Sequence, residues 1–294
     1  MDLLVGSHPE TWTLGEAQLL PYELWEERSP CGCGRPIQEC SFWSSVIDRI
    51  PIGQGDYPIE HFREEYGSGE TLRLRSALSM VTEGSNSLEK RKAERYGTVN
   101  KKYFRAVIEE AESRYGSISW LVDASKDAYR LYWLYLSNLF DIYVFHLTKD
   151  PRAYVYSIAR RQKTFGYKNI ARWAGRWLVD NAIKNRLLTK SFGNNSGMQV
   201  KYKKIASTPT SVIQKLTNTK KLSLKSINNG AKNSIIRSYT NHAVSGNEMR
   251  WKGTNIYLDD KWKVEMKKSH KDLVWNICKY LARRFGYRKK DETR

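Results

Sequence analysis

A cationic junction between an expected strand and an expected helix is the part of this sequence best suited to chemistry. The stretch DIYVFHLTKDPRAYVYSIARRQK, residues 141–163, begins as an apolar run and ends as a basic, helix-like run. Its Asp-Pro pair suits the first turn of a helix, whose backbone N–H groups and dipole attract anions. Lys149, Arg152 and Ser157 add cationic and hydroxyl groups. The pattern predicts a socket for a phosphate monoester; a capped surface helix with solvated charges is the alternative.

A second candidate position follows the apolar stretch ISWLVDAS, residues 118–125. Ser125 and Lys126 lie in a small-residue turn at the end of this expected buried strand. In an open parallel sheet, ligands lie beyond the carboxyl ends of the strands, so these two residues are candidates for contact with a bound anion. A plain turn with a solvated lysine is the alternative.

Three closely spaced cysteines suggest metal binding but do not complete a metal site. Cys31, Cys33 and Cys40 lack a clear fourth ligand, for which His8 or His61 would have to approach in the fold. We therefore favour free or redox-linked thiols and expect no bound metal.

The order of apolar and amphipathic segments predicts an α/β fold with a parallel sheet, because strands and helices alternate. We expect a single domain over residues 1–294, in which residues 51–100 form an insertion or lid and residues 220–241 form a loop. The expected strands are residues 118–125, 141–148 and 197–205, and the expected helices include 101–115, 128–140, 151–163, 169–191 and 268–287.

Composition excludes several classes of protein. Forty per cent hydrophobic residues in 294 are enough for a packed core, so the chain is not disordered. We find no apolar run of about 18 residues and expect no membrane span. The N-terminus lacks the features of a signal peptide, and four cysteines do not form a disulfide framework, so we expect a cytoplasmic protein.

The formal net charge of +19 is unevenly distributed along the chain. Residues 1–150 hold 17 Lys and Arg against 23 Asp and Glu, whereas residues 151–294 hold 33 against 8. The basic half attracts polyanions such as nucleic acid, a phosphorylated nucleotide, an acidic polysaccharide or a membrane surface.

Several segments together resemble the bacterial type of the sulfotransferase family that uses 3′-phosphoadenosine-5′-phosphosulfate. The segment KDPRAYVYS resembles the family's 3′-phosphate-binding strand and helix, with Lys149 where Arg is usual and Ser157 eight residues later. A lysine can still meet a phosphate, although without the bidentate fork of arginine. The other matching segments, in chain order, are GSHPETWTLGE, CGCGRPIQECSFW, LVDASK, VKYKKIASTP, and NHAVSGNEMRW with IYLDDKW.

The resemblance implies a three-layer P-loop-type fold, in which helices flank a central parallel sheet. It also implies transfer of a sulfuryl group from the nucleotide to a hydroxyl or amine of an acceptor, which is a sugar, lipid, small molecule or peptide. No metal and no specific nucleic acid are expected to take part.

The resemblance also assigns roles to individual residues. Glu16 would be the base that takes the acceptor's proton, with a capping or pairing role at a loop as the alternative, and Lys126 would neutralise the leaving phosphate oxygen. His242 heads the late loop and is a further candidate. The residues expected to contact the nucleotide are Ser125, Lys149, Arg152, Ser157, Gly246, Asn247 and Arg250.

One departure from the family pattern concerns the loop that binds the 5′-phosphosulfate. In the family this loop and the first strand precede the segment that resembles SHPE, and this sequence begins at Met1, so we expect both to be missing. A non-catalytic remnant therefore stays open as an alternative, as does a basic protein that binds nucleic acid or another polyanion. The sequence contains no recognised nucleic-acid-binding motif and no G-x-x-x-x-G-K-[ST] motif.

Overall fold

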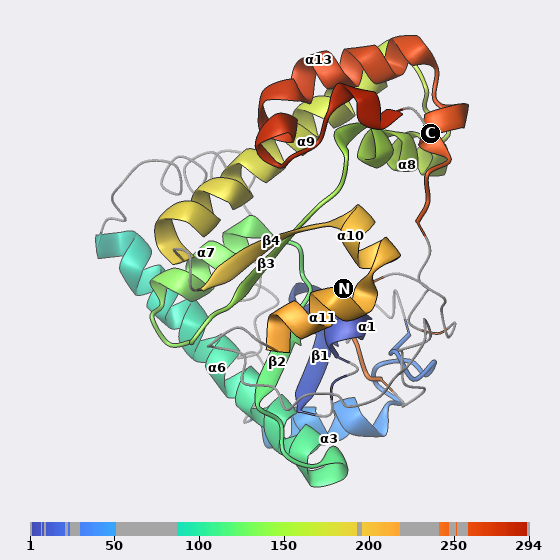
Figure 1. Ribbon diagram of the computed structural model, residues 1–294. Helices are drawn as coiled ribbons and strands as arrows, with labels where there is room; N and C mark the ends of the chain where they lie inside the picture. The colour runs from blue at the N-terminus through green and yellow to red at the C-terminus, as the bar shows by residue number, and fades with distance from the viewer. Residues whose placement is uncertain are drawn as a thin grey trace. The chain divides into compact units, whose positions relative to one another are not determined.

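Two parallel strand pairs, each joined by a helical crossover, organise the described parts of the chain (Figure 1). The computed structural model divides into two compact units, which we call unit 1 (Met1–Ile142 with Ile213–Asn255) and unit 2 (Tyr143–Val212 with Ile256–Arg294). The residues that the structure describes are 2–6, 8, 10–20, 23, 30–50, 87–192, 196–217, 241–246, 251 and 258–292.

Unit 1 is built on the parallel pair of β1 and β2. The register runs from Thr11 opposite Trp120 to Gly15 opposite Asp123, and all five residues of β1 are buried. The helix α6 makes the crossover between these strands (Figure 1). The elements of unit 1 are α1 (Asp2–Val5), β1 (Thr11–Gly15), η1 (Ala17–Leu19), α3 (Ser41–Arg49), α6 (Ser87–Tyr115), β2 (Trp120–Asp123) and α7 (Ala128–Leu136).

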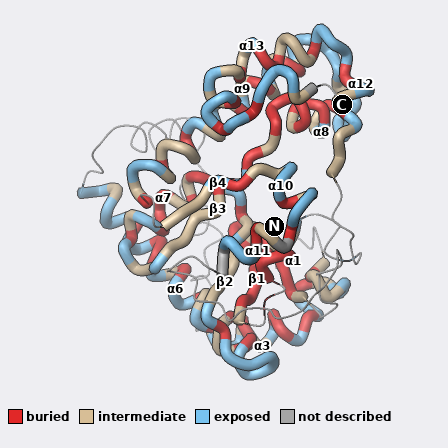
Figure 2. Tube along the Cα trace, viewed as in Figure 1, coloured by how far each residue is buried: buried red, intermediate tan, exposed pale blue. Residues whose placement is uncertain are grey.

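Aromatic side chains dominate the core of unit 1. Trp12 from β1, Phe42 and Trp43 from α3, and Tyr103 from α6 are all buried in one cluster. Burial of such large side chains is the main stabilising term available to a small unit. Figure 2 shows this burial along β1 and on one side of α3.

Unit 2 is built on the parallel pair of β3 and β4, in which Val144 lies opposite Gly197 and Thr148 opposite Lys201. Its core is formed by α8, α9 and α13, and includes Trp177, Trp275 and Phe285. The elements are β3 (Val144–Thr148), α8 (Pro151–Gln162), α9 (Tyr167–Leu187), the π-helical η2 (Leu188–Phe192), β4 (Gly197–Lys201), α10 (Tyr202–Ser207), α12 (Trp262–Glu265), α13 (Lys268–Arg284) and η4 (Lys289–Glu292), and α11 (Pro209–Thr217) begins in this unit.

The expected mixed α/β class is confirmed, and the described strands pair in parallel as expected. The described strands form two two-stranded sheets, one in each compact unit, and the single domain expected over residues 1–294 stays a prediction. The expected strand 197–205 ends at Lys201 and continues as the helix α10. Within the expected insertion or lid, residues 87–100 belong to α6; residues 51–86, like 220–240 of the expected loop, lie outside the described residues. None of the described helices has the length and apolar character needed to cross a bilayer.

Candidate functional site

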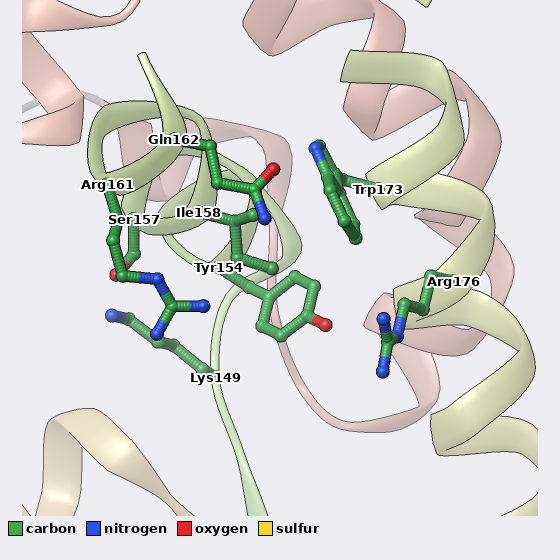
Figure 3. Close-up of a pocket in the computed structure, with 8 residues that line it drawn as sticks. All are labelled: Lys149, Tyr154, Ser157, Ile158, Arg161, Gln162, Trp173 and Arg176. Atoms are coloured by element: carbon green, nitrogen blue, oxygen red, sulfur yellow. The ribbon is translucent and has the colours of Figure 1, made fainter. Parts of the chain in front are cut away.

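A cationic pocket lies in unit 2, beside the helix that follows β3. Its volume is about 320 Å³, at the lower end of the range of about 300–1,000 Å³ found for ligand pockets. Figure 3 shows the aromatic ring of Tyr154 between the side chains of Lys149 and Arg161 on one side and those of Trp173 and Arg176 on the other. The complete lining is Lys149, Tyr154, Ser157, Ile158, Arg161, Gln162, Trp173 and Arg176.

Helical spacing brings most of this lining onto one face of α8. Residues three or four apart in a helix are neighbours on its surface, which places Tyr154, Ser157 and Arg161 in one row. Ile158 and Gln162 form the adjacent row of the same pocket. The helix α9 contributes Trp173 and Arg176 from the opposite side (Figure 3). Of the residues predicted to bind the nucleotide, the pocket therefore brings together Lys149 and Ser157.

Lys149 directly follows β3, at its carboxyl end, and lines the pocket. Its backbone carbonyl accepts a hydrogen bond from Trp177 Nε1 at 3.1 Å, and its Nζ lies 5.0 Å from the ring centroid of Tyr202. Burial lowers the pKa of its ammonium group below the ordinary lysine value. A partly desolvated cation of this kind gains more from a bound anion than a solvated one does.

Arg152 does not line this pocket, and the prediction that it contacts the phosphate is corrected by its surroundings. Its side chain is fully buried, and Nη2 lies 2.8 Å from Asp150 Oδ2. Its guanidinium also donates to the carbonyls of Arg288 and Lys289 and lies between the rings of Trp262 and Trp275. Arg152 is therefore a core residue that joins α8 to the C-terminal segment of unit 2.

The socket for a phosphate monoester predicted at the first turn of α8 also differs from the expectation. Asp150 caps the helix as expected, and its carboxylate accepts the backbone N–H of Arg152 at 2.9 Å. A carboxylate at this position opposes a second anion at the helix end. Of the cations that line the pocket, Lys149 adjoins the helix end, whereas Arg161 lies along the side of α8 and Arg176 lies on α9.

In unit 1, the two predicted catalytic residues lie side by side at the carboxyl edge of the strand pair. Lys126 Nζ lies 2.7 Å from Glu16 Oε1, and the lysine side chain is more exposed, at 68% against 20% for the glutamate. Glu16 directly follows β1, and Lys126 lies three residues beyond β2 with a left-handed backbone (φ 61°). The strand pairing thus brings together two residues that are 110 positions apart in the chain.

The start of the late loop reaches the same edge. Val244 bridges β1 at Gly15, and the backbone N–H of Glu16 donates to the carbonyl of Val244 at 2.8 Å. A side chain on Gly15 (φ 69°) would collide with that carbonyl, so only glycine fits there. Gly246, predicted to contact the nucleotide, lies beside Glu16: a Cβ at Gly246 would be 4.0 Å from Glu16 Oε1.

Ser125 is a further corrected prediction, because its hydroxyl is used inside the protein. The side chain is buried and donates to Asp123 Oδ1 at 2.5 Å, and it accepts the backbone N–H of Gln18 at 3.2 Å. It therefore holds the turn after β2 against η1. Asn247 and Arg250 lie outside the described residues.

The structure also shows residues that sequence reasoning missed. Arg161, Tyr154 and Arg176 line the cationic pocket, although only Lys149 and Ser157 were singled out there. The available signal for Tyr154 and Arg161 was helical spacing, since they lie three residues before and four residues after Ser157. His242, the further candidate of the late loop, lies against Cys31, Cys33 and Cys40, with its Nδ1 3.1 Å from Cys40 Sγ.

Comparison with protein-family models, with curated proteins and with solved structures finds no significant match for this chain.

Proposed function

We propose that this protein binds a 3′-phosphorylated adenosine nucleotide through the pocket of unit 2 and transfers the sulfuryl group of 3′-phosphoadenosine-5′-phosphosulfate to a hydroxyl or amine acceptor. In the fuller form of the proposal, the strands belong to a three-layer P-loop-type architecture. The observation that carries the proposal is the pairing of Lys149 and Ser157 in one cationic pocket. These are the two positions that resemble the family's 3′-phosphate-binding pair.

The chemistry of the pocket supports a phosphate ester with an aromatic or sugar portion. Lys149, Arg161 and Arg176 supply positive charge, and Ser157 supplies a neutral donor (Figure 3). Charge-assisted hydrogen bonds from such groups are the strong contacts of phosphate sites. Tyr154 and Trp173 offer flat apolar surface beside these cations.

In the proposed reaction, a bond forms between the acceptor oxygen and sulfur while the bond between sulfur and the 5′-phosphate oxygen breaks. The acceptor's proton passes to Glu16, and the leaving nucleotide keeps the electron pair of the broken bond. Lys126 neutralises charge on the leaving oxygen. As in phosphoryl transfer, positioning and charge stabilisation supply most of the rate enhancement.

The test is calorimetric titration of the full chain with 3′-phosphoadenosine-5′-phosphate and with the same nucleotide lacking the 3′-phosphate. We expect the first to bind and the second to bind far more weakly. Ser157→Ala should weaken binding of the first by roughly 1–3 kcal/mol, the cost of a lost charge-assisted hydrogen bond. The matched control is Ser207→Ala, an exposed helical serine of unit 2, which should leave the affinity unchanged.

Turnover is tested separately with sulfur-labelled 3′-phosphoadenosine-5′-phosphosulfate and a panel of sugars, phenols, lipids and amines. Transfer of label to an acceptor supports the enzyme, whereas tight nucleotide binding without transfer or hydrolysis supports the non-catalytic alternative. Equal affinity for nucleotides with and without the 3′-phosphate would overturn the proposed role of the pocket.

A further inference from the structure

Three cysteines and one histidine of unit 1 converge on a single point. Cys31, Cys33 and Cys40 come from the segment before α3, and His242 comes from the late loop, 211 positions after Cys31. Their ligand atoms all lie within 4.8 Å of one another. We propose that these four side chains bind one Zn²⁺ ion in a closed, structural site, against the expectation from the sequence that no metal is bound.

Two of the distances between the ligand atoms are close to the edges of a zinc tetrahedron, and a third is shorter. Zn–S bonds of about 2.3 Å and Zn–N bonds of about 2.0–2.1 Å give edges of about 3.8 Å between sulfurs and about 3.5 Å between sulfur and nitrogen. Cys33 Sγ lies 3.8 Å from Cys40 Sγ. His242 Nδ1 lies 3.6 Å from Cys31 Sγ and 3.1 Å from Cys40 Sγ.

The surroundings of His242 fix which ring nitrogen would face the metal. Nδ1 points at the sulfurs, while Nε2 lies 3.2 Å from the hydroxyl oxygen of Tyr115, to which a protonated Nε2 donates. The imidazole stacks on the ring of Phe42, with ring centroids 4.7 Å apart. The backbone carbonyl of His242 accepts a hydrogen bond from Trp43 Nε1 at 2.9 Å. An outer hydrogen-bond partner that sets the tautomer and ring orientation is typical of metal-bound histidines.

The backbone around the cysteines is shaped to bring the thiols together. The N–H of Cys31 donates to the carbonyl of Arg35 at 2.7 Å, which closes a tight loop. A Cβ on Gly32 would lie 2.6 Å from the backbone carbonyl oxygen of Asn241, so glycine is favoured between the first two cysteines. The N–H of Gly32 also donates to the carbonyl of Ala243 at 3.0 Å, which docks the loop directly on the segment that carries His242.

The ligand set indicates zinc in a structural role. Soft thiolates with one imidazole in tetrahedral geometry select Zn²⁺ over hard cations. Four protein ligands leave no open position for a reacting group, and three of them are almost fully buried. Binding displaces the protons of the three thiols to solvent and forms three Zn–S bonds and one Zn–N bond, without any oxidation or reduction.

The ion would connect a loop near the N-terminus to the segment that supports Glu16. Val244, two residues beyond His242, pairs with β1 on either side of Gly15. Joining positions so distant in the chain removes much conformational freedom from the unfolded state. The inference stands on the ligand geometry alone and does not depend on the proposed sulfuryl transfer.

The test is elemental analysis and X-ray absorption on the full chain purified from zinc-supplemented cells. We expect one zinc per chain, with three sulfur and one nitrogen neighbours at about 2.3 and 2.0 Å. Replacement by Co²⁺ should produce the thiolate charge-transfer and ligand-field bands of a tetrahedral site; these measurements need no variant.

The variants Cys33→Ser and His242→Ala should lose most of the bound zinc. The control Cys278→Ser removes the cysteine of α13, which lies in unit 2, and should keep a full equivalent. A full chain that binds no zinc, or a Cys33–Cys40 disulfide found by mass spectrometry in freshly isolated protein, would overturn the proposal. Neither readout involves nucleotide binding, so the metal site and the proposed function fail independently.

Discussion

At the scale of single residues, a substitution in the ion pair of Glu16 and Lys126 can distinguish a chemical role of Glu16 from a structural one. The lysine is 68% exposed, and exposed ion pairs contribute about 0–1 kcal/mol to stability. Glu16→Gln should therefore change the free energy of unfolding by less than about 1 kcal/mol. If Glu16 is the base, the same change should lower turnover roughly 10²–10⁴-fold with nucleotide affinity preserved. Turnover, nucleotide affinity and the free energy of unfolding are measured on one preparation by kinetics, calorimetry and urea denaturation. A normal turnover rate in Glu16→Gln would remove Glu16 from the mechanism.

Lys149 predicts a distinctive pH dependence of anion binding. Burial lowers the pKa of its ammonium group, so the group loses its charge below the ordinary lysine value of about 10.4. Between the lowered pKa and that value the unfolded chain binds more protons, so the contribution of Lys149 to stability rises with pH. Affinity for a phosphorylated nucleotide should change in the opposite direction and fall as pH rises through the lowered pKa.

The variant Lys149→Arg tests this dependence, because a guanidinium stays charged throughout the range. Calorimetric titrations with 3′-phosphoadenosine-5′-phosphate should show a fall in affinity for the unmodified chain and a much flatter profile for the variant. Lys168→Arg, at an exposed lysine near the start of α9, is the control and should retain the unmodified profile. Identical profiles for all three proteins would show that Lys149 does not carry the charge that binds the nucleotide.

Arg152 and Ser125 show what residue type alone does not reveal. Charge and position in the sequence marked both as ligands, yet Arg152 is buried between Trp262 and Trp275 and the Ser125 hydroxyl is bonded to Asp123. Those partners come from other elements or from a turn geometry that local spacing does not specify. A buried cation with several acceptors supports the fold and is not free for a ligand.

At the scale of elements, close packing between α6 and α7 depends on a helical glycine. A Cβ on Gly97 would lie 2.3 Å from the Cβ of Ser137, at the end of α7. Gly97→Ala should therefore be destabilising by about 1–2 kcal/mol, because overpacking outweighs the gain in helix propensity. Gly175→Ala in α9 is the matched control, since a Cβ there meets nothing within 4 Å, and it should be stabilising by about 0.5–1 kcal/mol. Urea denaturation measures both, and equal signs would contradict the packing argument.

Which elements were predictable follows from how they are stabilised. The segments that became α8, α9 and α13 were located correctly because amphipathic spacing or a cap is visible locally, such as Asp150 before Pro151. The strand β1 was missed although Thr11–Leu14 alternates polar and apolar residues, because so short a run is weak evidence for a strand. Its partners, β2 and Val244, are distant in the sequence.

The candidate sites divide in the same way. The pairing of Lys149 with Ser157 was predictable because both belong to one strand–helix unit. Arg176 was not predictable, because it lies on the next helix, α9, and reaches the pocket only through the packing of the two helices. The residue that completes the cysteine cluster, His242, was not predictable, since the sequence suggested only His8 and His61 for that position. In the structure, His8 Nδ1 instead accepts the N–H of Glu10, while His61 lies outside the described residues.

At the scale of the whole molecule, almost all of the net positive charge belongs to unit 2. The segments of unit 2 hold 26 Lys and Arg against 8 Asp and Glu, a net of +18, whereas those of unit 1 hold 24 against 23. Unit 1 is therefore close to neutral, at +1, although the first 150 residues of the sequence carry a net charge of −6. Such a field attracts any polyanion, so binding to nucleic acid alone would not reveal the specific ligand of the pocket.

Salt dependence distinguishes this general attraction from a nucleotide pocket. An oligonucleotide held through 6–10 phosphates loses about 10³–10⁵ in affinity between 50 and 200 mM salt, because bound counterions are released. A single nucleotide in a partly buried pocket has no condensed counterions, so its affinity should fall on the order of tenfold or less over the same range. Fluorescence competition with both ligands across the salt series measures the two slopes on the same chain. Parallel slopes, with Ser157→Ala affecting neither ligand, would favour a polyanion-binding surface over the nucleotide pocket, since a diffuse field does not depend on one neutral hydroxyl.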